Sequence, residues 1–84
     1  MHSQRFGRPI YVTSHAYVRM IERRISDALL LDLIESGETR YKDDTRLWIY
    51  KAYADRSDNL LCAAAALTAR AMIVKTVMHR FQLD

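Results

Sequence analysis

The run Leu60-Leu61-Cys62-Ala63-Ala64-Ala65-Ala66-Leu67 decides the fold, because it can be interpreted either as a strand or as part of a helix. Four successive alanines favour helix by intrinsic propensity, and no Gly or Pro interrupts the chain from residue 60 to residue 84. The run is short, however, and the polar segment Asp55–Asn59 before it is typical of a hairpin loop. We therefore prefer a fully buried strand with small side chains. A single long helix stays open as the alternative.

The segments on both sides of this run have the composition of strands. Met72–Met78 is rich in β-branched residues, and Arg46–Tyr53 combines aromatic with β-branched residues. Glu38–Lys42 predicts a further short strand, and Asp43 and Asp44 predict the turn that follows it. Four strands are thus expected in the second half of the chain.

Two helices are expected before these strands. The first spans His15–Arg24 after an N-cap at Thr13-Ser14, and the second begins after the N-cap Ser26 and ends at Gly37. On a helical projection of the first, one side collects the apolar residues Tyr17, Val18, Met20 and Ile21, and the other collects His15, Arg19, Glu22 and Arg23. The second helix carries an apolar stripe of Leu29, Leu30, Leu33 and Ile34.

Residues 1–9 lack apolar periodicity and contain Gly7 and Pro9, so we expect a flexible arm there. Ile10–Val12 predicts a short edge strand, at which a single folded domain of residues 10–84 begins. The fold class that follows is α+β, with the two N-terminal helices packed on one face of an antiparallel sheet of about four strands.

Composition narrows the class of protein. Half of the residues are apolar, and thirteen Lys and Arg against ten Asp and Glu give a net charge of +3, which permits an anionic partner without requiring one. The single cysteine, Cys62, has no intramolecular disulfide partner, which indicates a reducing compartment. The N-terminus is polar and no apolar run is long enough to span a bilayer. We expect a cytoplasmic protein without a membrane segment.

A motif in the first helix carries a resemblance to a known family. The pattern Ser14-His15-Ala16-x-x-Arg19-Met20-x-x-Arg23-x-Ile25-Ser26 precedes a Leu-rich helix that ends at Gly37, and Ile73-Val74-x-Thr76-Val77 follows near the end. Over about residues 10–78 the chain resembles a bacterial family of small domains of unknown function related to RelE-like toxins, within the Barnase–EndoU–colicin–RelE group of ribonuclease folds.

The resemblance implies a RelE-like fold and RNA cleavage without a metal. It implies catalytic roles for His15, Arg19 and Thr76, with His15 as the acid/base group and Thr76 on the sheet surface facing the site. Arg19 and Arg23 would bind the RNA phosphate. Histidine, with a reference pKa of about 6.5, can transfer protons near neutrality, and arginine can hold two phosphate oxygens at once. The plainer interpretation is a solvated helix face with an Arg–Glu pair involving Glu22.

Other chemistry-bearing residues give weaker patterns. Strand alternation places His79 with Ile73, Lys75 and Val77, away from Thr76 unless a bulge intervenes, and His79 and Arg80 indicate an exposed strand end. Trp48, Tyr50 and Tyr53 could stack on bases, but we assign Trp48 to the core. His2, His15, His79 and Cys62 lack metal-ligand spacing, so no metal or other cofactor is expected. Cys62 has no neighbouring base that would make it a nucleophile.

The functional hypothesis is a domain that binds RNA and cleaves it as a metal-independent endoribonuclease, in the manner of the toxin of a toxin–antitoxin pair. Its partners would be RNA and an antitoxin protein. The alternative is a non-enzymatic protein-interaction module or a homodimer, which the modest net charge favours.

Overall fold

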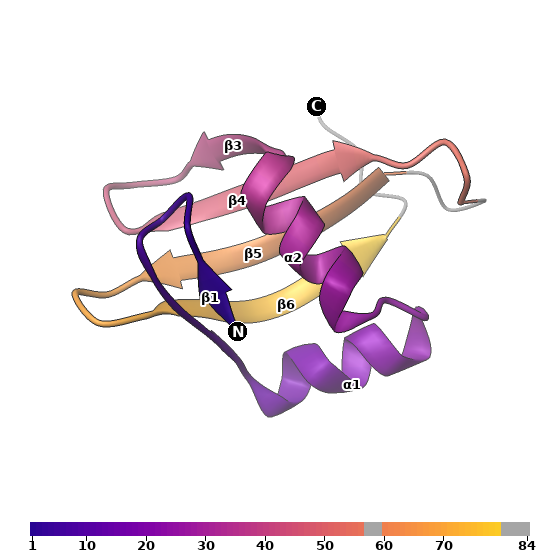
Figure 1. Ribbon diagram of the computed structural model, residues 1–84, viewed down its shortest axis with the longest axis horizontal. Coiled ribbons are helices and arrows are strands. Elements are labelled where there is room, and N and C mark those ends of the chain that lie inside the picture. Colours follow the sequence, from indigo (N-terminus) through magenta and orange to yellow (C-terminus); the bar gives the residue numbers. More distant parts are fainter. Residues whose placement is uncertain (57–59, 80–84) are drawn as a thin grey trace.

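A curled sheet of six strands, with two helices on its concave side, makes up the computed structural model of the protein, which describes residues 1–56 and 60–79 (Figure 1). The elements follow one another as β1 (His2–Ser3), β2 (Arg8–Val12), α1 (Ser14–Glu22), α2 (Asp27–Ser36), β3 (Glu38–Tyr41), β4 (Arg46–Ala52), β5 (Leu60–Leu67) and β6 (Met72–His79). The hairpin loop expected at Asp55–Asn59 lies partly outside the described residues, and Arg80 lies wholly outside them.

The sheet is larger than predicted and of mixed direction. Its strand order is β1-β2-β6-β5-β4-β3, and β2 runs parallel to β6 whereas the other neighbours are antiparallel. The prediction of a RelE-like antiparallel sheet of about four strands is therefore wrong. After β2 the chain passes through α1 and α2 to β3 at the far edge of the sheet and returns through β4 and β5 to β6, so the parallel pair is joined by a long connection, as such pairs require.

Residues 1–9, expected as a flexible arm, take part in a hairpin that folds against α2. β1 pairs with β2, and the backbone amides of Gln4 and Arg5 donate to the Glu35 carboxylate at 2.8 and 2.9 Å. The Arg5 guanidinium donates to the carbonyl oxygens of Ile34 and Gly37. These partners lie about thirty residues away in the chain, so local periodicity carries no sign of them.

Both helices have the N-caps that the sequence predicted, although α1 spans Ser14–Glu22 rather than His15–Arg24. The Thr13 hydroxyl accepts from the Ala16 amide, and the Ser26 hydroxyl accepts from the Leu29 amide. α2 ends at Gly37, where an added Cβ would lie 2.6 Å from the Leu33 carbonyl oxygen and 2.8 Å from Ile49 Cγ2. Gly37 is thus required by the close approach of α2 to β4.

The buried side of α1 differs from the predicted one. Ala16 and Met20 are buried, whereas Tyr17, Val18 and Ile21 are exposed over 43, 53 and 76% of their surface. α1 lies along β6 (Figure 1), and the small, buried Ala16 side chain suits a close approach of the helix to the strand. On a helical projection, the large apolar Ile21 counts more toward the predicted buried side than the small Ala16 does. The predicted side therefore differs from the one that faces the core.

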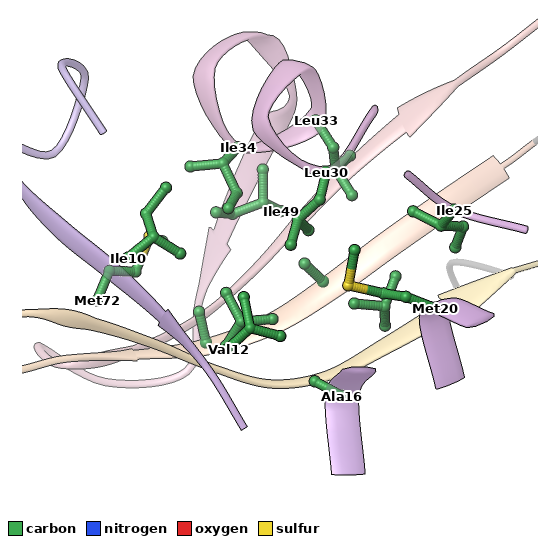
Figure 2. Packing of buried hydrophobic residues seen from close by; sticks show 14 of the residues in the cluster. Ile10, Val12, Ala16, Met20, Ile25, Leu30, Leu33, Ile34, Ile49 and Met72 are labelled. Atoms are coloured by element: carbon green, nitrogen blue, oxygen red, sulfur yellow. The ribbon is translucent and has the colours of Figure 1, made fainter. Parts of the chain in front are cut away.

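The core lies between the helices and the sheet. Ala16, Met20 and Ile25 approach it from α1 and the turn after it, while Leu30, Leu33 and Ile34 approach it from α2 (Figure 2). Ile49 and Met72 meet them from β4 and β6 (Figure 2). The strand preferred for Leu60–Leu67 is confirmed as β5, and its Leu61, Ala63 and Ala65 join this core.

Strand alternation divides the sheet into a face covered by the helices and an opposite one, which we call the helix-free face. On β3 to β6 the helix-free face carries Glu38, Arg40, Arg46, Trp48, Tyr50, Cys62, Ala64, Ala66, Ile73, Thr76 and Met78. Trp48, assigned to the core from the sequence, is on this face and exposed over 36% of its surface, so that assignment is wrong. Its neighbours Leu47 and Ile49 point to the helices instead.

A β-bulge in β6 changes which side chains share a face. Ala65 pairs with Val74 and Ala64 with Thr76, which leaves Lys75 as the extra residue. Beyond the bulge, His79 pairs with the buried Leu61 and points to the same side as Val77, opposite to Thr76. The predicted separation of His79 from Thr76 is confirmed, but the expected grouping of Ile73 and Lys75 with Val77 is wrong.

Candidate functional site

His15 lies exposed in the first turn of α1, at the point where this helix is tied to β6. The Thr13 amide donates to the Val74 carbonyl oxygen, and the Thr13 hydroxyl donates to the Lys75 carbonyl oxygen, both at 3.2 Å. The N-cap of α1 is therefore bound to the strand at its bulge. This brings the end of α1 that carries His15 to the part of β6 that carries Lys75.

Arg19 and Arg23 have structural partners within the fold. The Arg19 guanidinium forms an ion pair with Glu22 at 2.9 Å, and both side chains are exposed. The Arg23 guanidinium donates to the Val77 carbonyl oxygen on the edge of β6, beyond the point where β2 ends. The stripe of His15, Arg19 and Arg23 thus lies on the flank of α1 that adjoins this edge.

Thr76 is half-buried on the helix-free face, directly opposite Ala64. It follows the bulge residue Lys75, whose carbonyl oxygen is bound by Thr13. Thr76 therefore points to the face of the sheet opposite α1, and the two share only the neighbouring stretch of β6 at Lys75.

A groove that the sequence did not single out lies next to Thr76. It has a volume of about 190 Å³ and is lined by Lys42, Arg46, Leu47, Trp48, Ala64, Ala65 and Lys75. A second groove of about 270 Å³ adjoins it and shares Lys42 and Trp48, with Arg40 and Tyr41 on its other side. Together they form a hollow around the Trp48 side chain, which we call the Trp48 groove.

The charge around the Trp48 groove is mainly positive. Arg46 is held by Asp43 at 2.6 Å, and its hydrogen bonds keep the pKa of the Asp43 carboxyl far below its ordinary value. Arg40, Lys42 and Lys75 form no ion pair with another of the described residues. By contrast, α2 carries Asp27, Asp32 and Glu35 and no basic residue. α2 is therefore acidic, whereas the surroundings of the Trp48 groove are mainly basic.

A polar cluster between α2 and β4 has all its groups engaged. The Asp32 carboxylate accepts from the Tyr53 hydroxyl at 2.5 Å and from Lys51 Nζ at 3.0 Å. These hydrogen bonds, that of Tyr53 foremost, lower the pKa of Asp32. Burial and the bond to Asp32 raise the pKa of Tyr53 above its ordinary value. The cluster joins the helix to the strand and presents no reactive group.

Cys62 and the histidines form no metal centre in the part of the chain that the structure describes, where no group of three or more His, Cys, Asp or Glu could hold an ion. Cys62 is buried, and burial raises its pKa to about 12, so the thiol stays protonated at neutral pH. Neither described helix is long and apolar enough to cross a membrane.

A protein-family model matches residues 12–79, which span α1, α2 and the strands from β3 to β6. Its description is "Domain of unknown function (DUF4258)". The chain belongs to this family. Searches of the curated proteins and of the solved structures find no match to the chain. The matched range includes both the stripe on α1 and all residues of the Trp48 groove.

Sequence reasoning identified the stripe but missed the Trp48 groove. Arg46 and Trp48 stand two positions apart on a strand, so alternation alone assigns both to one face. Because a charged side chain such as that of Arg46 is rarely buried, this face of β4 is expected to contact solvent. The sequence therefore contained an indication that Trp48 is not in the core. Nothing in the sequence showed that Lys42 and Lys75 would meet there, since they come from opposite sides of β4 and β5 in the sheet.

Proposed function

We propose that this protein binds RNA and cleaves it without a metal, at the junction between α1 and β6. The observation that carries the proposal is the bond from the Thr13 hydroxyl to the Lys75 carbonyl oxygen. It fixes the exposed His15 beside a strand that offers Lys75 and Thr76. A proton-transfer group and a cation then lie near the same edge of β6, and the Thr76 hydroxyl follows on the helix-free face of that strand.

The reaction that suits these groups is an internal transesterification. A base removes the proton of the ribose 2′-hydroxyl, and the 2′-oxygen forms a bond to phosphorus. The bond from phosphorus to the 5′-oxygen breaks, and an acid protonates that oxygen, which leaves a cyclic phosphate and a free 5′-hydroxyl. His15 performs one of the two proton transfers, and general acid–base catalysis of this kind is worth about 10²–10⁴-fold.

The arginines of α1 stabilise the charge on the phosphate in this proposal. The ion pair of Arg19 with Glu22 is exposed, and pairs of this kind contribute at most about 1 kcal/mol, so a phosphate can replace the carboxylate. Arg23 donates to the Val77 carbonyl, but a guanidinium has further donors that can reach an anion. Thr76 contributes its hydroxyl from the sheet.

The biological role that we propose is that of a toxin related to RelE-like proteins, with an antitoxin as its protein partner and RNA in the cytoplasm as its target. The motif from His15 to Ser26 supports this role. The cations that line the Trp48 groove also support it, because a phosphate backbone binds chiefly through Lys and Arg.

The test is incubation of the purified protein with RNA in the presence of EDTA, beside His15→Ala and His2→Ala. Both histidines are exposed, but His2 lies on β1, which β2 separates from β6 in the sheet. We expect His15→Ala to lose cleavage by about 10²-fold or more and His2→Ala to keep it. Absence of cleavage, or equal cleavage by the wild type and His15→Ala, would refute the enzymatic role.

A second candidate function is a protein-interaction surface on α1, in complex with another protein or as a homodimer. It is favoured by Tyr17, Val18 and Ile21, large apolar side chains that are exposed next to one another on this helix. Sizing of the wild type and of Ile21→Glu over a dilution series tests the homodimer. A salt titration of RNA binding separates the two functions, because phosphate contacts weaken steeply with salt and an apolar interface does not.

A further inference from the structure

We infer that the Trp48 groove is a subsite for single-stranded RNA, in which an unpaired base stacks on Trp48 while Lys42 and Lys75 bind the adjoining phosphates. The inference rests on the proposed function, since it extends the same RNA from the junction of α1 and β6 across the helix-free face. It adds a site that the motif on α1 does not contain.

The register of the sheet places Thr76 and Trp48 in one line across the helix-free face. Thr76 pairs with Ala64, Ala64 pairs with Trp48, and Trp48 pairs with Arg40. Neighbouring strands lie about 4.8 Å apart, so Trp48 is roughly 10 Å from Thr76 across the face. An extended nucleic-acid strand that has one phosphate beside Thr76 can therefore place a following base over Trp48.

The residue between the two sites leaves space for a base. Ala64 has a single methyl group, and it lines the groove beside the exposed indole of Trp48. Ala66 on the same face is also small. The side chains beside Trp48 on β5 are thus small, and in this inference the flat face of a base lies against the exposed part of the ring.

The charges of the groove suit the backbone of a nucleic acid. Lys42 comes from the turn after β3 and Lys75 from the bulge in β6, so the two ammonium groups approach Trp48 from different strands. Neither forms an ion pair with another of the described residues. Lysines bind phosphates as point charges without reading sequence, which predicts tolerance of base identity.

The geometry favours a single strand over a duplex. Stacking on a protein ring requires an unpaired base whose face is open, and in a duplex the base faces are covered by their neighbours. A positive groove with an aromatic side chain is the arrangement found in proteins that bind single strands with little sequence preference. A protein partner would have to cover Lys42, Arg46 and Lys75, which is costly for an apolar interface.

Trp48 is the single tryptophan of the chain, so its fluorescence reports directly on the groove. We would titrate the wild type with a short 2′-O-methyl oligoribonucleotide, which has no free 2′-hydroxyl and cannot be cleaved by the proposed reaction. We expect saturable quenching, an affinity that falls steeply with added salt, and weaker binding of the matching duplex. Absence of quenching, or equal affinity for the duplex, would overturn the inference.

Variants locate the contacts by anisotropy of a labelled oligonucleotide. We expect Trp48→Ala to weaken binding about 5- to 150-fold, the range measured for loss of one stacked base. The double variant Lys42→Ala/Lys75→Ala should weaken it at least about tenfold and reduce its salt dependence. Lys51→Ala is the matched control, because Lys51 binds Asp32 and Ser36 beside α2. An equal loss in Lys51→Ala would contradict the inference.

The same measurements separate this inference from the proposed function. If quenching occurs but neither the wild type nor His15→Ala cleaves RNA, the subsite stands and the ribonuclease role fails. If the wild type cleaves RNA through His15 but Trp48→Ala binds and cleaves equally well, the ribonuclease role stands and the subsite is refuted. Normal binding by His15→Ala together with lost cleavage supports both.

Discussion

On β4, neighbouring residues face two different environments. Leu47 and Ile49 point toward α1 and α2 and are fully or almost fully buried, whereas Arg46 and Trp48 point to the helix-free face and are exposed. The covered face is closely packed and apolar, whereas the helix-free face carries exposed cations and Trp48 beside buried or half-buried residues such as Cys62 and Tyr50. The covered face therefore supplies most of the apolar core, whereas part of the helix-free face is exposed.

The largest effect is expected from the covered face. Ile49→Ala removes a fully buried side chain beneath α2 and should lower the free energy of unfolding by about 2–5 kcal/mol. Ile21→Ala, at a position exposed over 76% of its surface on α1, should change it by less than about 0.5 kcal/mol. Urea denaturation of both variants measures the difference. Similar losses would show that the division into a packed and an open surface is incorrect.

Two neighbouring alanines of β5 compare the faces within one strand. Ala63 is buried on the covered face, and Ala63→Leu should destabilise the protein by about 1–3 kcal/mol through overpacking. Ala64 lines the Trp48 groove, and Ala64→Leu should cost less than about 0.5 kcal/mol while filling the space beside Trp48. Thermal unfolding measures the first effect and oligonucleotide binding the second. Equal destabilisation by both would contradict the comparison.

Two arginines beside the edge of β6, where the two faces meet, differ in their contribution to stability: Arg23 is bound to the strand, and Arg19 is exposed. Arg23→Ala removes the donor to the Val77 carbonyl oxygen and should cost about 1–2 kcal/mol. Arg19→Ala removes an exposed ion pair and should cost at most about 0.5 kcal/mol. Chemical denaturation of the two variants in parallel tests this order. A larger loss for Arg19→Ala would reverse the structural assignment.

The smallest effect concerns pH and the polar cluster beside α2. Hydrogen bonds from Tyr53 and Lys51 lower the pKa of Asp32 below 3.8, so its contribution to stability is present above that pH and is lost as the pH falls through the lowered value. Because Asp32 is exposed, the contribution should be under about 1 kcal/mol. Comparing unfolding of the wild type and Asp32→Asn at neutral and strongly acidic pH measures it. A gap that widens on acidification would refute the assignment.

The sequence predicted local elements well where capping and turn residues mark them. Thr13, Ser26 and Gly37 mark the ends of α1 and α2, and the turn residues at Asp43 and Asp44 mark the end of β3. These signals act over a few residues, through side-chain bonds to nearby backbone groups or through close backbone contact. The composition of Leu60–Leu67 was ambiguous, and its short length between polar segments favoured the strand that β5 forms.

The candidate site was predicted only in part, for the same physical reason. His15, Arg19 and Arg23 are spaced along one helix, so their common flank follows from helical geometry. Lys42, Trp48 and Lys75 belong to separate strands and the turn after one of them, and no local pattern shows that they share a groove. The bulge at Lys75 also shifts the alternation of β6, and alternation is the rule on which face assignment depends.

By itself, the sequence determined the two capped helices, the β-rich second half and the motif on α1, because these depend on interactions between residues close together in the chain. The tertiary structure alone decided the parallel pairing of β2 with β6, the docking of residues 1–9 on α2 and the side of α1 that is buried. It also decided that Trp48 faces outward among cations. Each of these depends on contacts between residues far apart in the chain, and the energy of such contacts is set by the packing of the whole domain.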